Sequence, residues 1–303
     1  MNCIHCGSKA YFELRYSGHF VCKKHFIGLF ERRVKKTIRQ NKLLSNGDHI
    51  LVALSGGKDS MTCLKILHDI TSKNPKVHLS AVTIDEGIRG KNMAYAVDFC
   101  NSLGVEHNVV SFKDFFGLNI DEVLHNVKAE GVLACSICGV LKRRLLNDFS
   151  RKHKVSKVAT GHNLDDEIQS AFMNFMRSDH ERMARVGPMV GVKAHGGFVP
   201  RIKILRECPE DEVKAYADLL KLPYFKNQCV HSKTSLRTTV KKMLDSLEVN
   251  HPGSKYQMLR STDELASILR KNIKEADPNQ CRKCGEPSAQ EICKTCQLLS
   301  KLT

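Results

Sequence analysis

The feature that most constrains the fold is a short apolar run that leads directly into a glycine-rich turn and then into a helical pattern. The run is HILVAL, residues His49–Leu54, and the turn that follows it is SGGKDS. Apolar side chains then recur with helical spacing at Met61, Leu64 and Leu67. This order predicts a buried strand, a tight turn and an amphipathic helix, which is the repeating unit of an α/β protein.

The same alternation continues toward the middle of the chain. Further strand patterns lie at Val77–Ile84, His107–Phe112 and Lys157–Gly161. Helical patterns separate and follow them, around Lys91–Leu103, Asp121–Glu130, a basic helix after a loop at Cys135, a helix from Leu164, and basic helices at Ser232–Leu247 and Lys255–Lys274. We therefore expect a doubly wound, Rossmann-like parallel sheet with helices on both faces and a ligand site beyond the carboxyl ends of its strands.

The turn SGGKDS has the chemistry of a phosphate site. Gly56 and Gly57 allow a sharp turn that presents backbone N–H groups to an anion, and the following helix adds its dipole. Lys58 adds positive charge, and the hydroxyls of Ser55 and Ser60 can donate hydrogen bonds. The turn is not a Walker A loop, which requires another glycine where this chain has valine.

Two groups of metal-ligand residues flank this body. The first has the spacing C-x2-C followed by C-x2-H and contains Cys3, Cys6, Cys22 and His25. The second repeats C-x2-C and contains Cys281, Cys284, Cys293 and Cys296. Each group supplies four soft ligands, so we expect two closed zinc sites that stabilise small modules.

A third pair of cysteines needs a separate explanation. Cys135 and Cys138 lie in CSICGVLKRR, and the pair is compatible with half a zinc site, a redox dithiol or part of an iron–sulfur cluster. Cys229, in a polar segment, is the best candidate to join them. The remaining cysteines, Cys63, Cys100 and Cys208, fit small packed side chains.

The charge balance favours a nucleic-acid partner. The formal net charge is +16, and a basic surplus of this size attracts acidic polymers. The candidate contact residues are Arg143, Arg144, Arg151, Lys152, Arg177, Arg182, Arg185 and the stretch Lys233–Lys242. No stretch reaches the ~20 apolar residues of a membrane helix, and nothing near Met1 resembles a signal peptide, so we expect a cytoplasmic protein without a membrane partner.

Four sequence features together resemble the PP-loop ATP pyrophosphatase superfamily: SGGKDS, CSICGVLKRR, ATGHNLDDE at Ala159–Glu167, and the single later Cys229. Within it the chain resembles the TtcA/TtuA family of tRNA thiolation enzymes. The two zinc modules make it most similar to archaeal NcsA-like 2-thiouridine synthetases. The resemblance implies a tRNA substrate, cleavage of ATP to AMP and pyrophosphate, and a homodimer. It implies free sulfide or a ubiquitin-like thiocarboxylate carrier as the sulfur donor.

The resemblance also implies roles for individual residues. It assigns the ATP phosphates to Ser55, Gly56, Gly57, Asp59 and Ser60, with Ala53 and Gly161 near the nucleoside. It assigns a [4Fe–4S] cluster to Cys135, Cys138 and Cys229, which leaves one iron free to bind sulfide; the competing reading is a dithiol that forms a persulfide. Lys142, one helical turn after Cys138, would neutralise developing charge. One of Asp165 and Asp166, with Asp166 favoured, would assist deprotonation or hold Mg²⁺.

The expected mechanism has two steps, adenylation of the C2 oxygen of a tRNA uridine and its replacement by sulfur. We expect four segments: a zinc finger at 1–30, the PP-loop domain with the iron–sulfur site at 31–230, a basic helical segment at 231–275 and a zinc ribbon at 276–303. An amidating PP-loop ligase would not need the cysteine trio, and a zinc-containing RNA-binding protein would not need SGGKDS.

The modified uridine is expected at the wobble position, with the T-loop uridine as the alternative. TtuA-like enzymes modify the T-loop to stiffen thermophile tRNA, whereas NcsA-like enzymes modify the wobble uridine. This chain keeps spare cysteines, an Asn46-Gly47 pair and only 8 prolines, unlike the composition that hyperthermophile proteins favour.

Overall fold

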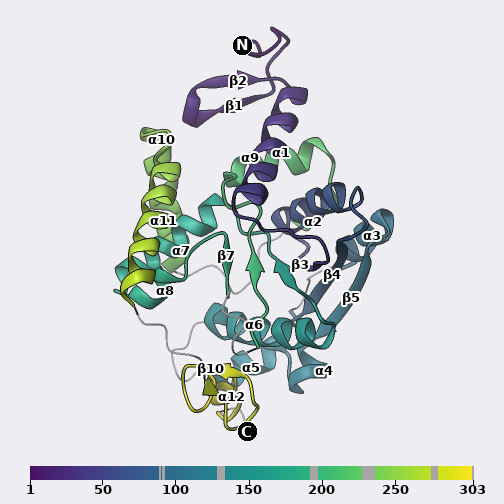
Figure 1. The fold of residues 1–303 in the computed structure, drawn as a ribbon, viewed down its shortest axis with the longest axis vertical. Coiled ribbons are helices and arrows are strands. Elements are labelled where there is room, and N and C mark those ends of the chain that lie inside the picture. The colour runs from purple at the N-terminus through teal and green to yellow at the C-terminus, as the bar shows by residue number, and fades with distance from the viewer. Residues whose placement is uncertain are drawn as a thin grey trace.

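The computed structural model describes residues 1–88, 90, 93–127, 134–191, 197–226, 236–273 and 279–301, without the side chains of 125–127, 134 and 135. The molecule is elongated, with a small N-terminal hairpin at one end, a small C-terminal module at the other and a sheet between them (Figure 1). Among the described residues, no helix is both long and apolar enough to cross a bilayer.

The central sheet has six strands in the order β5-β4-β3-β6-β8-β7. Its strands are β3 (His49–Leu54), β4 (His78–Asp85), β5 (Glu106–Ser111), β6 (Lys157–Ala159), β7 (Met189–Val190) and β8 (Arg201–Ile202). All neighbours pair in parallel except β7, which pairs with β8 antiparallel at the edge. The predicted parallel α/β sheet is therefore confirmed.

The helices of the described residues cover both faces of this sheet (Figure 1). They are α1 (Lys23–Gln40), α2 (Lys58–Thr71), α3 (Ala94–Leu103), α4 (Phe112–Phe116), α5 (Ile120–Val127), α6 (Ala134–Lys152), α7 (Leu164–Met176), α8 (His180–Ala184), α9 (Glu210–Leu219), α10 (Leu236–Asn250), α11 (Ser254–Asn272) and α12 (Lys294–Leu299). One apolar cluster joins α1, α2, α3 and α9 to the sheet, and a second joins α4, α5, α6 and α12 to it.

Two short hairpins complete the fold. The N-terminal hairpin pairs β1 (Phe12–Leu14) with β2 (His19–Val21) around a single 3-10 turn at Arg15–Ser17. The C-terminal hairpin pairs β9 (Asn279–Gln280) with β10 (Pro287–Ser288). We call residues 1–22 the N-terminal module and residues 279–301 the C-terminal module.

Helix α1 connects the N-terminal module to the core. Its buried residues include Phe26, Phe30 and Val34, which recur every four positions and so lie on one face. Phe30 stacks on Tyr216 of α9 with ring centroids 4.4 Å apart. The helix runs without a break through residue 30, where we expected one segment to end and the next to begin.

Two local predictions were wrong. We expected a loop at Cys135, but α6 begins at Ala134, because Ile137, Leu141 and Leu145 bury one helical face of this segment. We also expected the strand that begins at His107 to extend to Phe112. That strand ends at Ser111, whose hydroxyl accepts the N–H of Asp114 at 2.9 Å and so caps α4.

The strand order places a switch point beside β3. The chain passes from β3 to β4 on one side, and β6 lies on the other side. In open parallel sheets, ligands bind in the crevice at such a point, beyond the carboxyl ends of the strands. The turn after β3 and the loop after β6 both open into this crevice.

Candidate functional site

The phosphate loop, residues Leu54–Ser60, connects β3 to α2. Gly56 adopts a left-handed backbone with φ of 79°, which favours glycine. The hydroxyls of Ser55 and Ser60 lie 3.1 Å apart, and that of Ser60 donates to the carbonyl of Gly57 at 3.0 Å. The loop is therefore shaped by its own serines.

The start of α2 is open to an anion. Its N-cap residue is Gly57, and no side chain caps the first turn. The first N–H groups of a helix have no partner within the helix, and its dipole makes this end positive. An uncapped helix start at the switch point of a sheet is suited to bind a phosphate.

Gly161, in the loop after β6, is required by a close approach. A Cβ atom at this position would lie 2.7 Å from the backbone carbonyl carbon of Asp59 and 2.7 Å from the backbone nitrogen of Ser60. No side chain fits there, so glycine lets the β6 loop lie against the phosphate loop. Ala53, the other residue expected near the nucleoside, lies in β3 and is half-buried.

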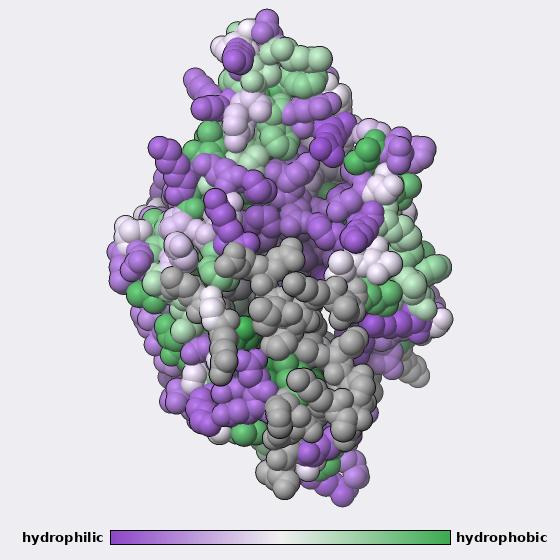
Figure 2. Space-filling view, turned by 180° about the vertical axis from the view of Figure 1, so that it is seen from behind, coloured by the Kyte–Doolittle hydropathy of each residue, from purple (hydrophilic) through white to green (hydrophobic). Residues whose placement is uncertain are grey.

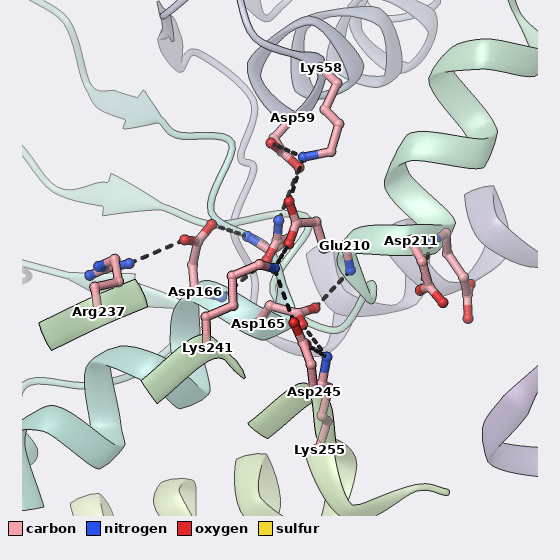
Figure 3. A network of polar contacts seen from close by, with 12 residues as sticks. Lys58, Asp59, Asp165, Asp166, Glu210, Asp211, Arg237, Lys241, Asp245 and Lys255 are labelled. Carbon is pink, nitrogen blue, oxygen red and sulfur yellow. Dashed lines mark hydrogen bonds and ion pairs between the residues drawn. The ribbon is translucent and has the colours of Figure 1, made fainter. Parts of the chain in front are cut away.

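Lys58 and Asp59 belong to a charged network around the start of α2 (Figure 3). The Lys58 ammonium donates to Asp59 at 3.0 Å and to Glu210, the first residue of α9, at 2.9 Å. The other oxygen of Asp59 accepts the side-chain amide of Asn163 at 3.0 Å. Burial alone would lower the pKa of Lys58, but Asp59 and Glu210 outweigh it and raise the pKa, so the ammonium stays charged.

The structure separates Asp165 from Asp166, which sequence reasoning did not. Asp165 is buried; its carboxylate accepts the backbone N–H of Glu210 at 2.7 Å and pairs with Lys255. Asp165 therefore satisfies the first N–H of α9 and ties α7 to α11 (Figure 3).

Asp166 is the accessible member of the pair. It forms a capping box with Asn163, and its side chain is 31% exposed. Arg237 of α10 donates to it at 3.2 Å. Burial raises the pKa of Asp166 above the ordinary aspartate value, although Arg237 acts in the opposite direction. Of the two aspartates, Asp166 is the one that can meet a ligand.

Lys142 lies on α6 beside Cys138, as the helical spacing predicted. Its ammonium pairs with the buried carboxylate of Glu86, which follows β4. Burial would lower the pKa of Lys142, but Glu86 and the Cys138 thiol outweigh it and raise it. Lys142 and Cys138 therefore lie near the carboxyl end of β4, next to β3.

The third cysteine group is only partly described. Cys138 is half-buried in α6. Only the backbone of Cys135 is described, in the first turn of the same helix, and Cys229 lies outside the described residues. The assignment of these three cysteines to one cluster stays a prediction.

The two terminal groups converge as their spacing predicted. In each group the four candidate ligand atoms lie within 4.8 Å of one another. We call Cys3, Cys6, Cys22 and His25 the N-terminal cysteine site, and Cys281, Cys284, Cys293 and Cys296 the C-terminal cysteine site. The backbone N–H of Cys293 is the main cause that lowers the pKa of Cys281 to about 6. Donor sets of this kind suit a tetrahedral metal ion.

The basic residues expected to meet RNA have unequal surroundings. Arg144 is 13% exposed and pairs with Asp148 and Glu286, and Arg151 also pairs with Glu286. Arg143, Lys152, Arg182 and Arg185 are exposed. Hydrophilic side chains gather over a broad area below the N-terminal module on the face seen from behind (Figure 2).

Sequence reasoning did not assign a role in this site to the residues that hold it together, although two of them lie in the stretch Lys233–Lys242 that we expected to contact RNA. These are Glu86, Asn163, Glu210, Arg237, Lys241 and Lys255. Only Asn163 had a local signal, because an asparagine three residues before an aspartate fits a capping box. The contacts that join the others to Asp165, Asp166, Lys142 and each other span at least 31 residues of chain, although Lys241 and Lys255 also pair with the nearby Asp245.

The fold and the phosphate loop define a nucleotide-binding α/β protein of the PP-loop type. The PP-loop domain family matches residues 28–247. NcsA, a tRNA 2-thiolation protein of Haloferax volcanii, is 35% identical over 319 residues, which cover 100% of this chain and 99% of that protein. The tRNA-5-methyluridine(54) 2-sulfurtransferase of Pyrococcus horikoshii is 33% identical over 300 residues, covering 98% of this chain and 93% of that protein.

A solved structure is similar along the full length. It is the U34-tRNA thiolase NcsA from Methanococcus maripaludis with its [4Fe-4S] cluster, at a TM-score of 0.86 and 37% identity, covering 100% of this chain and 96% of that one. This chain belongs to the PP-loop family, within the group of tRNA 2-thiolation proteins.

Proposed function

We propose that the protein is a tRNA 2-thiouridine synthetase that uses ATP to replace the C2 oxygen of a uridine with sulfur. One observation carries the proposal. The open start of α2, the accessible Asp166 and the pair of Lys142 with Cys138 follow three neighbouring strands, β3, β6 and β4. ATP and a nucleotide substrate can therefore meet in one crevice of the sheet.

The first step is activation of the uridine. The phosphate loop binds the triphosphate through the N–H groups of Gly57 and the first turn of α2, and Ser55 and Ser60 add hydroxyl donors. The uridine C2 oxygen attacks the α-phosphate, pyrophosphate leaves, and the oxygen becomes part of an AMP leaving group. Asp166 either accepts the uridine proton or holds Mg²⁺ on the pyrophosphate.

The second step is sulfur transfer. When the sulfur nucleophile attacks C2, negative charge develops on the uracil and on the departing AMP. The Lys142 ammonium neutralises this charge. Glu86 keeps that ammonium charged and directed from α6 toward the end of β4. Expulsion of AMP leaves a carbon–sulfur double bond at C2.

We propose that Cys135, Cys138 and Cys229 hold a [4Fe–4S] cluster. Three thiolates would leave one iron without a protein ligand, and the group would supply there a binding place for a sulfide that comes from the external donor. The Methanococcus maripaludis protein carries such a cluster. Cys138 beside Lys142 fits this role, because a neighbouring cation favours a thiolate.

We propose that the two terminal cysteine sites bind zinc. Each offers four ligands and is closed, so it suits a structural ion and not a catalytic one. Metal analysis of the purified protein should find two zinc ions per chain. Substitution of Cys138 should leave that number unchanged.

We propose the wobble uridine as the target. The similar solved structure is named for uridine 34, the wobble position, and the 33% identical Pyrococcus protein for position 54. The exposed Arg143, Arg182 and Arg185 would contact the tRNA backbone. Thiolation assays with free sulfide and with a ubiquitin-like thiocarboxylate carrier, run in parallel, identify the sulfur donor.

The test uses anaerobic protein, ATP and unmodified tRNAs for lysine, glutamate and glutamine. AMP and pyrophosphate should form together with 2-thiouridine in the anticodon fragment, and a wobble cytidine should abolish it. Release of ADP would contradict the nucleotide chemistry. Sulfur found only in the T-loop fragment would contradict the choice of uridine and leave the chemistry intact.

A further inference from the structure

Helix α6 carries candidate catalytic residues at one end and the C-terminal module at the other. Cys138 and Lys142 lie in its first half. Arg144, Asn147, Asp148 and Arg151 follow with spacings of three and four residues, so they share one face in the second half. The C-terminal module packs against this face through a polar network, and Leu298 of α12 adds an apolar contact.

Glu286 is the centre of that network. Its side chain is 7% exposed. One carboxylate oxygen accepts the side-chain amide of Asn147 at 2.8 Å, and the other accepts Arg151 at 2.7 Å. The same Asn147 accepts the backbone N–H of Val199 at 3.0 Å, which ties the network to the chain just before β8. A buried carboxylate with this many partners fixes the module on α6.

Arg144 extends the network to a metal-ligand atom. Its Nε donates to Asp148 at 2.6 Å, and its Nη1 donates to the sulfur of Cys284 at 2.9 Å. The guanidinium also lies 3.4 Å from Glu286. Three acceptors hold this side chain in one orientation, and one of them belongs to the C-terminal cysteine site.

Cys284 differs from its fellow ligands in where its hydrogen bond comes from. The sulfur of Cys281 accepts the backbone N–H of Cys293 at 3.2 Å, and that of Cys293 accepts the N–H of Cys296 at 3.4 Å. These donors belong to the module itself. Cys284 is the exposed member of the site, and its donor comes from α6.

We propose that Arg144 is a positioning residue that couples the C-terminal cysteine site to helix α6, and through α6 to the turn that carries Cys138 and Lys142. Four thiolates around a divalent ion leave a net negative charge, and a guanidinium hydrogen bond to one sulfur stabilises that charge. The bound metal in turn holds Cys284 where Arg144 can reach it. This inference rests on the proposal that the site binds a metal ion.

The test compares full-length wild type with Arg144→Met, Arg144→Lys and Arg282→Met, each loaded with Co²⁺ in place of the native ion. Methionine keeps the aliphatic stem and removes the donor. Arg282 is the matched control, because it forms an exposed ion pair with Glu291 in the same module. Two readouts are followed: the thiolate-to-cobalt absorbance with its decay in excess chelator, and amide hydrogen exchange over α6.

Loss of an outer-shell donor typically weakens metal retention by about tenfold or more, so Arg144→Met should speed one phase of cobalt release and shift its absorbance. The phase from the N-terminal cysteine site is the internal reference and should not change. Exchange over Ala134–Lys152 should rise, and Arg144→Lys should restore part of both effects. Arg282→Met should match wild type.

Three results would overturn the proposal. If Arg144→Met releases cobalt at the rate of wild type and shows the same amide exchange over α6, Arg144 does not couple the C-terminal cysteine site to α6. If Arg282→Met has the same effect as Arg144→Met, the effect reflects charge in the module and not this contact. If wild type binds no cobalt at Cys281–Cys296, the metal assignment fails together with the coupling. This result is distinct from one in which cobalt binds and Arg144 has no effect.

Discussion

The two terminal cysteine sites have similar ligands but are joined to the molecule in different ways. Cys22 is the N-cap of α1, an 18-residue helix whose buried face reaches into the main core. Cys293 is the N-cap of α12, a helix of 6 residues in the C-terminal module. The first site therefore continues into the core through the backbone, whereas the second is held against α6 by side chains.

This difference indicates different consequences of metal loss. Loss of the metal ion at the N-terminal cysteine site affects the start of α1, whose buried face is part of the main core. Loss of the metal ion at the C-terminal cysteine site affects the contact between the C-terminal module and α6. Substitutions in the two modules and in their contacts with the core distinguish these two consequences.

Cys22→Ser should destabilise the whole protein, and the matched Cys293→Ser should not. Without its ligand the first turn of α1 loosens, and Phe26 and Phe30 lose packing, so we expect a loss of roughly 3–5 kcal/mol in unfolding free energy, the range for losing a core aromatic side chain. Calorimetry of both variants is the measurement. Equal downward shifts of the main transition in the two variants would contradict the comparison.

Glu286→Gln should loosen the C-terminal module while the main transition stays in place. The change leaves Arg144 and Arg151 beside a neutral acceptor, at a cost of about 1–3 kcal/mol for poorly satisfied buried groups. Hydrogen exchange over α12 reports the loosening. Glu291→Gln, in an exposed pair, is the control and should have no effect. Unchanged exchange in Glu286→Gln would show that apolar contacts alone dock the module.

The ion pairs of Glu210 with Lys58 and Lys241 should make the stability of the main core sensitive to acid. Burial would raise the pKa of Glu210, at the start of α9, but Lys241 and Lys58 outweigh it and lower the pKa to about 2. Its contribution is thus full above the ordinary glutamate pKa of about 4.3 and is lost as pH falls from there toward the folded value.

Unfolding measured between pH 5 and pH 2 should therefore be less pH-dependent in Glu210→Gln than in wild type. Glu181→Gln, in an exposed pair with Arg185, is the control. If both variants keep the slope of wild type, Glu210 does not provide acid sensitivity.

The smallest effect is expected at Tyr11. Its hydroxyl donates to the carbonyl of Ala215 in α9 at 3.3 Å, a side-chain link between the N-terminal module and the core. Tyr11→Phe should cost about 0.5–1.5 kcal/mol, the usual value of one hydrogen bond. Chemical denaturation measures it, with the exposed Tyr95→Phe as reference. A larger loss would mean that side-chain contacts such as this one, and that of Tyr16 with Tyr256, attach the module more strongly than the comparison assumes.

Local patterns were sufficient to predict the body of the fold. The predicted strand His49–Leu54 has the observed bounds, and the helix predicted from Leu164 begins there, because apolar spacing and the Asn163 cap both act within a few residues. The two-residue strands β7 and β8 were missed, since such short segments carry no periodic signal.

The candidate site was predictable only in part for the same reason. The residues of the phosphate loop are neighbours in sequence, and their turn formed as expected. The separation of Asp165 from Asp166 depends on Glu210 and Lys255, which lie far along the chain. Two adjacent aspartates with the same sequence surroundings thus differ through contacts made only in the folded protein.

The helix starts around Asp59 have a consequence for ligand choice. Helices α2, α7 and α9 begin close together, as the contacts of Asn163 with Asp59 and of Glu210 with Lys58 show. Asp166 and Asp165 already occupy the amide ends of α7 and α9 as internal counter-anions. To bind at the start of α7 or α9, a sulfate, chloride or free carboxylate would have to displace the carboxylate of Asp166 or Asp165. The start of α2 has no side-chain cap, so of these three helix starts it is the one that we propose for the phosphates.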